Sequence, residues 1–234
     1  MNMKTKTLLT ALLTLPLLAG VARATLYTST YDPNTAIPDG STLGITETET
    51  ISSDVGDAAI NNVDVTLNIR GGYNGDLYGY LVLQSADSST TTAILLNRVG
   101  STASDPFGAA GSGFDVTLTG GATANSGDIH TAAETAGAAL TGTYLADGRS
   151  VSPLTVTDGS PRTAGLDTLN GADANGTWTL FLADLSEGGG QSTLVSWTLG
   201  VSVVPEPVTW ALLIFASELV LRGLVVWRLR RGRA

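Results

Sequence analysis

Two segments of the chain alternate apolar and polar side chains residue by residue. The apolar members are Val63, Val65, Leu67 and Ile69 in the first segment, and Val195, Trp197, Leu199, Val201 and Val203 in the second. Successive side chains of a β-strand point to opposite faces, so this period-2 alternation predicts half-buried strands. A helix would instead place its apolar residues three or four positions apart. The two segments therefore indicate a β fold.

Five further apolar segments are bounded by turns rich in Gly, Asn and Asp, and we expect them to be strands. They cover residues 43–51, 77–84, 91–98, 114–119 and 177–185. Seven or eight short strands with Gly-rich turns predict an all-β sandwich. A weak, alanine-rich helical pattern covers 129–140, and the Ala/Gly/Ser/Thr-rich stretch 101–165 is expected to form long loops rather than core.

The charge of the chain is unevenly distributed along it. Of its 234 residues, 12 are Lys or Arg and 21 are Asp or Glu, with one His and no Cys. The middle, 25–204, holds 19 acids, four Arg and no Lys, a formal charge of −15. Segments 1–24 and 205–234 carry +3 each. The absence of Cys excludes disulfide scaffolds and cysteine metal sites, and the acid excess argues against a nucleic-acid partner.

Residues 1–24 have the pattern of a secretory signal peptide. Lys4 and Lys6 precede an apolar run over 8–18, and Ala22 and Ala24 form the small-x-small motif of a signal-peptidase cleavage site. The run is too short for the roughly 20 residues that span a bilayer. We therefore expect 25–204 to be an exported domain.

The C-terminal segment combines a strand breaker, an apolar span and a basic tail. Pro205, Glu206 and Pro207 end any preceding strand, because proline donates no backbone hydrogen bond. The 20 residues 208–227 match the length of a transmembrane helix. Beyond them lies an Arg cluster expected to stay cytoplasmic, formed by Arg228, Arg230, Arg231 and Arg233.

Glu218 and Arg222 place two charges inside this apolar span. A charge at the bilayer centre costs on the order of 2.5 to 3.5 kcal/mol, and such residues are candidates for functional sites. Their i, i+4 spacing puts them on one helix face, where they can also neutralise each other in a marginal anchor. A permanently anchored protein whose Glu218–Arg222 pair contacts a partner helix is a third interpretation.

The proline motif, the apolar helix beginning Trp210-Ala211-Leu212-Leu213 and the terminal Arg cluster together resemble the PEP-CTERM sorting signal of Gram-negative bacteria. The resemblance covers the last 30 residues. It implies recognition and cleavage by an exosortase of the inner membrane while the body lies in the periplasm. Transfer of the body to the cell surface or the extracellular matrix would follow, in bacteria that secrete exopolysaccharide.

Two segments of the middle domain resemble the P domain, or Homo B domain, of proprotein convertases and bacterial subtilisin-like proteases. They are NIRGGYNGDLYGYLVL, 68–83, and the run from LNGADANGTWTL, 169–180, to LVSWTL, 194–199. The resemblance spans most of 37–203 and implies a jelly-roll-like β-sandwich. In those proteases the domain stabilises a catalytic domain, which has no counterpart in this sequence.

No catalytic constellation is evident in the sequence. A Ser-His-Asp triad would need His130, the only imidazole, and its polar context favours a solvated loop histidine. Trp178 and Trp197 fall at strand positions where core packing is the stronger interpretation, rather than a sugar-binding platform. Asn175-Gly176-Thr177 matches a glycosylation sequon, but reads better as the turn before the Trp178 strand.

Calcium is the one cofactor for which the sequence offers candidate ligands. Candidate oxygen ligands are Asp76, Asp167, Asn170, Asp173, Asn175 and Asp184. Four of them lie close together between 167 and 175, without the spacing of an EF-hand. Asp and Asn are also common turn formers, so a turn without metal is the other interpretation.

The expected function is that of a non-catalytic exported module at the cell surface or in the extracellular matrix, sorted by exosortase at 205–207. An accessory role in proteolysis is the alternative that the P-domain resemblance implies. Exosortase and signal peptidase are expected as processing enzymes, and the membrane holds 208–227 before processing. The mature domain would then contact exopolysaccharide or a separate protease.

Overall fold

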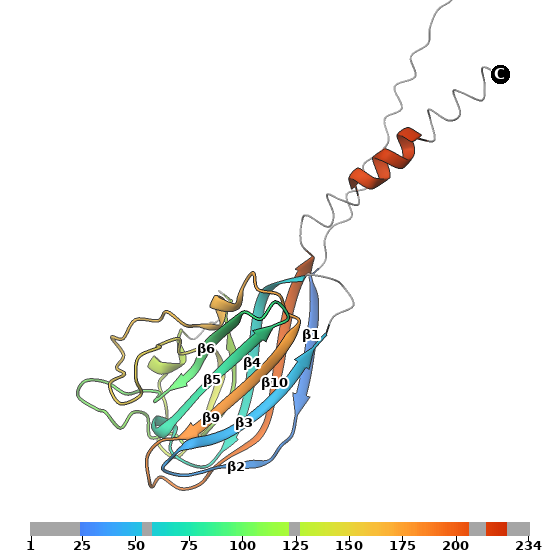
Figure 1. Cartoon of the computed structure of the whole chain (residues 1–234). Coiled ribbons are helices and arrows are strands. Elements are labelled where there is room, and N and C mark those ends of the chain that lie inside the picture. The colour runs from blue at the N-terminus through green and yellow to red at the C-terminus, as the bar shows by residue number, and fades with distance from the viewer. Residues whose placement is uncertain (1–23, 53–57, 122–126, 206–213, 224–234) are drawn as a thin grey trace, which may run out of the picture.

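The computed structural model of the protein describes residues 24–52, 58–121, 127–205 and 214–223 (Figure 1). Within these ranges two β-sheets pack face to face, which confirms the predicted sandwich. The strands of the first sheet are β1 (Thr25–Tyr31), β2 (Thr35–Ile37), β4 (Ala58–Arg70), β7 (Gly113–Thr119), β8 (Leu140–Leu145) and β10 (Ser192–Pro205). Its order is β1-β10-β4-β7-β8, with β2 also paired to β10.

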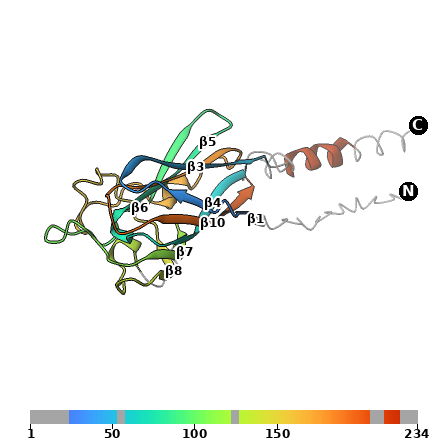
Figure 2. The same cartoon turned by 90° about the horizontal axis from the view of Figure 1, so that it is seen from below.

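The second sheet has the order β3-β9-β5-β6 and is antiparallel throughout. Its strands are β3 (Ser41–Ile51), β5 (Leu77–Ser85), β6 (Thr90–Asn97) and β9 (Gly176–Asp184). Figure 2 shows the two layers, with β3 and β5 in one and β7 and β8 in the other. In the first sheet the β7–β8 pair is parallel, and its other pairs are antiparallel.

The core lies between the sheets and is built from the alternating residues. Val63, Val65, Leu67 and Ile69 of β4 are buried, as predicted. Trp178 and Trp197 are also completely buried, which confirms their expected place in the core. A register shift in β10 between Leu194 and Ser196 turns Leu194 inward and leaves Val195 half-buried. This bulge is why the predicted alternation in β10 is wrong at Val195.

The stretch 101–165 contributes more to the core than we expected. It contains β8 and the 3-10 turn η2 (Ile129–Thr131), which lies at the start of the weak helical pattern over 129–140. Phe114, Ile129, Leu140, Tyr144 and Ala146 from this stretch are all buried in the core. The weak helical pattern does not form an α-helix, and the expectation that this stretch forms long loops rather than core was wrong.

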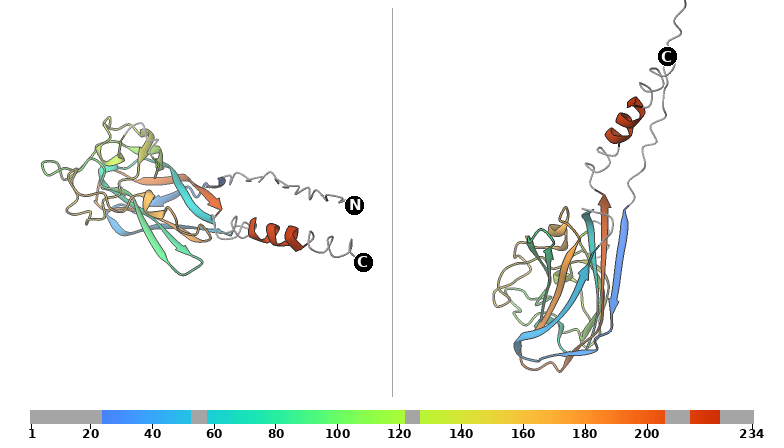
Figure 3. Two further views of the ribbon diagram at one scale, coloured as in Figure 1. Left: turned by 90° about the horizontal axis from the view of Figure 1, so that it is seen from above. Right: turned by 45° about the vertical axis from the view of Figure 1, so that its right-hand side comes forward.

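The sandwich has two poles, which we name for their distance from the chain ends. Thr25 at the start of β1 pairs with Val203 near the end of β10, and this end is the proximal pole. Leu77 at the start of β5 pairs with Asp184 at the end of β9, and this end is the distal pole. Figure 3 shows the start of β1 (blue) and the end of β10 (orange-red) at this same end of the sandwich.

Most of the predicted targeting residues lie outside the described residues. These are the signal segment 1–23 with Ala22, then Glu206, Pro207 and the arginines 228–233. Ala24 is exposed just before β1, and Pro205 is the last residue of β10. Of the predicted span 208–227, residues 214–223 are described and form a helix. Among the described residues, no helix has both the length and the apolar character needed to cross a membrane.

The two charges of that helix pair as expected. The Nη2 atom of Arg222 lies 3.4 Å from Oε2 of Glu218, one helical turn away. The pair is exposed. This contact favours mutual neutralisation within the helix.

Candidate functional site

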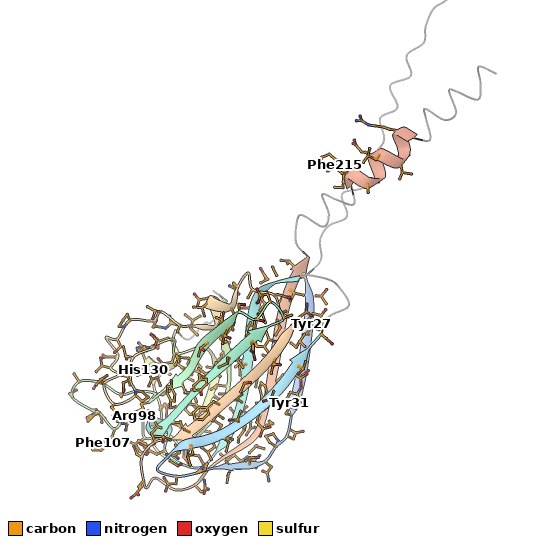
Figure 4. The ribbon with its side chains drawn as sticks, in the orientation of Figure 1. Tyr27, Tyr31, Arg98, Phe107, His130 and Phe215 are labelled. Carbon is orange, nitrogen blue, oxygen red and sulfur yellow. The ribbon has the colours of Figure 1, made fainter. Side chains whose placement is uncertain are left out.

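His130 is the centre of a buried cluster of charged side chains. Its side chain is completely buried, and Nδ1 lies 2.8 Å from Oδ2 of Asp147. Nε2 lies 2.9 Å from the carbonyl oxygen of Ser101. The expectation of a solvated loop histidine was therefore wrong, because Ser101 in the loop before β7 and Asp147 in the loop after β8 occupy both ring nitrogens. Figure 4 labels His130 within the sandwich domain.

The geometry around the ring determines its charge. A carboxylate and a carbonyl are both acceptors, so each ring nitrogen must carry a proton to satisfy its partner. Burial by itself lowers the pKa of His130, but the hydrogen bond and charge of Asp147, together with the bond to Ser101, raise the pKa above its ordinary value. His130 is thus held as an imidazolium in an ion pair.

Asp147 joins this ion pair to the loop that follows β8. Its Oδ2 also accepts a hydrogen bond from the backbone N–H of Asn97 at 3.2 Å, and its Oδ1 accepts one from the N–H of Arg149 at 3.2 Å. The guanidinium of Arg149 is buried between Asp147 and Asp128, at 3.4 and 3.2 Å. The cluster therefore ties four segments together through bonds to charged groups, each worth about 1.5 to 3 kcal/mol.

Arg162 completes the cluster from the far side of the loop. Its Nη2 donates to the carbonyl of Ala146 at 2.7 Å and its Nε to the carbonyl of Asp147 at 2.9 Å. Three of the four arginines of the middle domain, Arg98, Arg149 and Arg162, thus make hydrogen bonds within the fold. In the sequence of this domain Arg is scarce and Lys is absent. This scarcity is the one sequence signal that the remaining arginines have a structural role.

The six candidate calcium ligands do not form one site. Asp76 and Asp184 lie at the distal pole, whereas Asp173 and Asn175 precede the opposite end of β9, and η3 (Leu166–Leu169) carries Asp167. Asp173 accepts hydrogen bonds from the backbone N–H and the side-chain amide of Asn175, at 2.9 and 2.8 Å, which is a local turn. Asn170 follows η3 directly and donates its N–H to Asp167. In the part of the chain that the structure describes, no three acidic or imidazole side chains gather to hold a metal.

Asp184 is a buried carboxylate with incomplete hydrogen bonding. Its Oδ2 accepts a bond from the hydroxyl of Ser192 at 3.1 Å, but its buried Oδ1 has no partner among the described residues. Burial, with smaller contributions from the charges of Asp76 and Asp39, raises the pKa of Asp184 to about 6. Burial likewise raises the pKa of Asp76, against the opposing effects of Ser186 and Arg98.

A cavity of about 480 Å³ opens beside these acids at the distal pole. It is lined by Tyr73, Asp76, Arg98, Pro106, Phe107, Ser186, Glu187 and Gly189. Arg98 has φ of 50°, a left-handed conformation that is uncommon outside glycine. Its guanidinium is fixed by the carbonyl of Gly75 at 3.0 Å and by Asp76 at 3.5 Å.

A second cavity of about 440 Å³ lies on the outer face of the β3-β9-β5 sheet and carries no charged group. Its lining residues are Thr42, Tyr78, Tyr80, Ser152, Pro153, Leu154, Phe181 and Leu185. Tyr80 and Phe181 are cross-strand partners whose rings stack at 4.7 Å, and Tyr78 meets Tyr80 edge-on at 5.8 Å. Sequence reasoning missed this site, because Phe181 lies about a hundred positions from Tyr78 and Tyr80 and meets them only through the pairing of β9 with β5.

The class of protein that these features define is a β-sandwich with a charged interior cluster and two cavities at or near one pole. No family model matches the chain, and no curated protein matches it.

Among solved structures, the chain is similar to the serine protease of Aeromonas sobria, at 15% identity and a TM-score of 0.42 over 77% of this chain and 27% of that one. It is also similar to the complex of that protease with its chaperone, at 16% identity and a TM-score of 0.41 over 79% and 28%. The chain spans less than a third of each matched chain.

Proposed function

We propose that residues 25–204 are a non-catalytic accessory module that acts beside a separate protease outside the cytoplasm. The observation that carries the non-catalytic part is the position of His130. It is the only histidine of the chain, and its two nitrogens are both occupied, by Asp147 and by Ser101. A general base must reach the proton that it abstracts, and a buried imidazolium has neither access nor a free acceptor atom.

The accessory part of the proposal comes from the P-domain resemblance of 68–83 and 169–199. That resemblance implies a jelly roll, in which a sheet of four strands in the order 1-8-3-6 packs on one in the order 2-7-4-5. When β2 and β8 are set aside, the order β1-β10-β4-β7 packed on β3-β9-β5-β6 has this connectivity. The agreement supports a P-domain-like module.

Export is the proposed setting of this module. The signal-peptide pattern of 1–24 and the sorting pattern of 205–234 support a route through signal peptidase and exosortase. The body would stand in the periplasm while 208–227 is held in the inner membrane, and would then reach the cell surface.

A second candidate function is a structural module of the extracellular matrix, favoured by the sorting pattern alone. In this case the mature domain would contact exopolysaccharide instead of a protease. Its formal charge of −15 disfavours acidic polysaccharides unless cations bridge them.

A gene deletion separates the two functions. If the module is an accessory of proteolysis, deletion shortens the thermal half-life of the secreted serine-protease activity, and purified full-length chain restores it. The chain alone should show no turnover of casein and no labelling by a fluorophosphonate. Unchanged protease half-life together with altered retention of matrix polysaccharide would favour the second function, and turnover abolished by a Ser substitution would contradict both.

A further inference from the structure

The most exposed large apolar side chains of the sandwich are unevenly distributed. Among the described residues of the two sheets and their loops, these are Leu26 (65% exposed), Leu43 (84%), Phe107 (69%) and Leu154 (85%). Leu26 lies on β1 near the proximal pole. The other three lie at or beside the two cavities, since Phe107 and Leu154 line them and Leu43 follows the lining residue Thr42.

The two cavities belong to one continuous surface. Leu185 lines the uncharged cavity and the next residue, Ser186, lines the charged one, so the loop after β9 separates them. The same loop contacts the turn between β2 and β3, where the N–H of Gly188 donates to Asp39 at 3.3 Å. We call this surface the distal face and define it by residues 39–43, 73–76, 105–108, 152–154 and 185–189.

The distal face carries more acidic than basic side chains. Asp39, Asp105 and Glu187 are exposed on it, whereas Asp76 is buried and paired with Arg98, the cation that lines the charged cavity. The exposed Arg70 lies at the same pole, at the end of β4. Arg98 is already engaged by Gly75, Asp76 and Ser186, so little of its charge faces outward. An apolar surface with an acidic rim is complementary to an apolar surface with a basic rim.

The positions of the chain ends keep the distal face free. Both ends of the sandwich leave at the proximal pole, as the pairing of Thr25 with Val203 requires. Figure 4 shows Phe107 and Arg98 at the end away from Tyr27. A module tethered through either terminal segment would therefore present the distal face outward.

We infer that the distal face docks a partner protein whose contact surface presents apolar side chains surrounded by Lys and Arg. Phe107 and Leu154 serve as the anchors, because exposed aromatic and aliphatic side chains at cavities are where binding energy concentrates. The inference relies on the proposed function only for the identity of the partner as a protease, and not for the chemistry of the contact.

The test uses full-length chain in a mild non-ionic detergent and three synthetic fluorescent peptides. One alternates Leu and Arg over eight residues, the second alternates Leu and Glu, and the third alternates Ser and Arg. At 150 mM salt, where exposed charges are screened beyond about 8 Å, we expect the Leu–Arg peptide to bind best in fluorescence polarisation. Hydrogen–deuterium exchange should show protection at 105–108 and 185–189.

Phe107→Ala and Leu154→Ala should each weaken Leu–Arg binding by about tenfold, the effect of losing one anchor. Leu26→Ala is the matched control, an exposed apolar residue at the other pole, and should leave binding unchanged. All three residues are exposed, so the variants should melt like the parent.

Several results would overturn the inference: no binding of the Leu–Arg peptide at 1 mM, equal binding of the Ser–Arg peptide, protection away from the distal face, or equal weakening by Leu26→Ala.

The deletion strain keeps this failure distinct from failure of the proposed function. Restoration of protease half-life by the Phe107→Ala/Leu154→Ala chain would contradict the docking surface alone. If the parent chain binds the Leu–Arg peptide but does not restore the half-life of the protease activity, the accessory function alone would be contradicted.

Discussion

His130 and Asp147 form an ion pair in which Nδ1 and Oδ2 are 2.8 Å apart and neither side chain is exposed to solvent. Removing one partner of such a pair leaves an uncompensated buried charge. Because Asp147 also bonds to Asn97 and Arg149, the loss would spread to the loop after β8 and to the end of β6.

His130→Leu should lower the free energy of unfolding by about 3 to 5 kcal/mol, since the Asp147 carboxylate loses its imidazolium. Asp147→Asn should have an effect of the same order, and the double variant should lose less than the sum of the two. Urea unfolding of all four chains gives the coupling free energy. Additive effects would contradict a direct ion pair.

The same pair predicts how stability depends on pH. The pKa of His130 is higher in the folded state than its ordinary value of 6.5, so the native protein binds this proton more tightly than the unfolded chain does. The contribution of His130 is complete below pH 6.5 and is lost as pH rises through the folded-state pKa. Melting temperatures measured from pH 6 upward should show this loss in the parent and lack it in His130→Leu.

For Asp184, in contrast to His130, the charged form is the one that destabilises the fold. Its pKa of about 6 lies above its ordinary value of 3.8, so ionisation between these values weakens the fold. Asp184→Asn keeps the shape of the side chain and the bond from Ser192. We expect it to be more stable than the parent at pH 7.5 by on the order of 1 to 3 kcal/mol, and equally stable near pH 4.

The control for that experiment is Asp115→Asn, an exposed aspartate on β7. Its effect should stay within about 0.5 kcal/mol at both pH values. Equal gains from Asp115→Asn and Asp184→Asn would mean that reduced overall charge, and not the burial of Asp184, is the cause.

Two glycines of one segment test the close approach of β9 to β5. Gly171 and Gly176 both have positive φ, at 84° and 149°. A Cβ at Gly176 would lie 2.2 Å from the carbonyl oxygen of Gln84, whereas no atom lies within 4 Å of a Cβ at Gly171. Gly171→Ala should cost about 1 to 2 kcal/mol from backbone strain alone. Gly176→Ala should cost at least about 1 kcal/mol more in thermal or urea unfolding, and equal costs would contradict the contact.

Processing at the C-terminus should leave the sandwich intact, because β10 ends at Pro205. Mass spectrometry of the surface-released protein should find a new C-terminus near Pro207. Recovery of the tail through Arg233 would favour permanent anchoring, in which the Glu218–Arg222 pair remains in the membrane.

The strands with regular alternation, or with an apolar run between turn residues, were predictable, whereas β1, β2 and β8 were not. β4 could be predicted because Val63, Val65, Leu67 and Ile69 all face the core. In β8 only Leu140 and Tyr144 are well buried, and three exposed residues separate them, so no period appears. In β1 the inward positions Tyr27, Ser29 and Tyr31 are only half-buried, and one of them is polar.

The candidate site was less predictable than the fold. Its key pairs join residues far apart in sequence, such as Tyr80 with Phe181 and His130 with Ser101. Local composition even indicates the wrong environment for His130, since Gly127 and Asp128 make its surroundings look like a solvated turn. Burial of this histidine depends on contacts with Ser101 and Asp147, which lie 29 and 17 positions away in the sequence.

The adjacent exits of β1 and β10 determine how the module would respond to mechanical force. Hydrogen bonds between antiparallel strands are perpendicular to the strands. Tension between residues 24 and 205 would open the β1–β10 ladder one pair at a time, beginning at Thr25 and Val203. Tension between residue 205 and the distal face would instead run along β10 and load its ladders with β1 and β4 all at once. Anchored by its C-terminal end and held by a partner at the distal face, the module would resist pulling; stretched between its two ends, it would unzip.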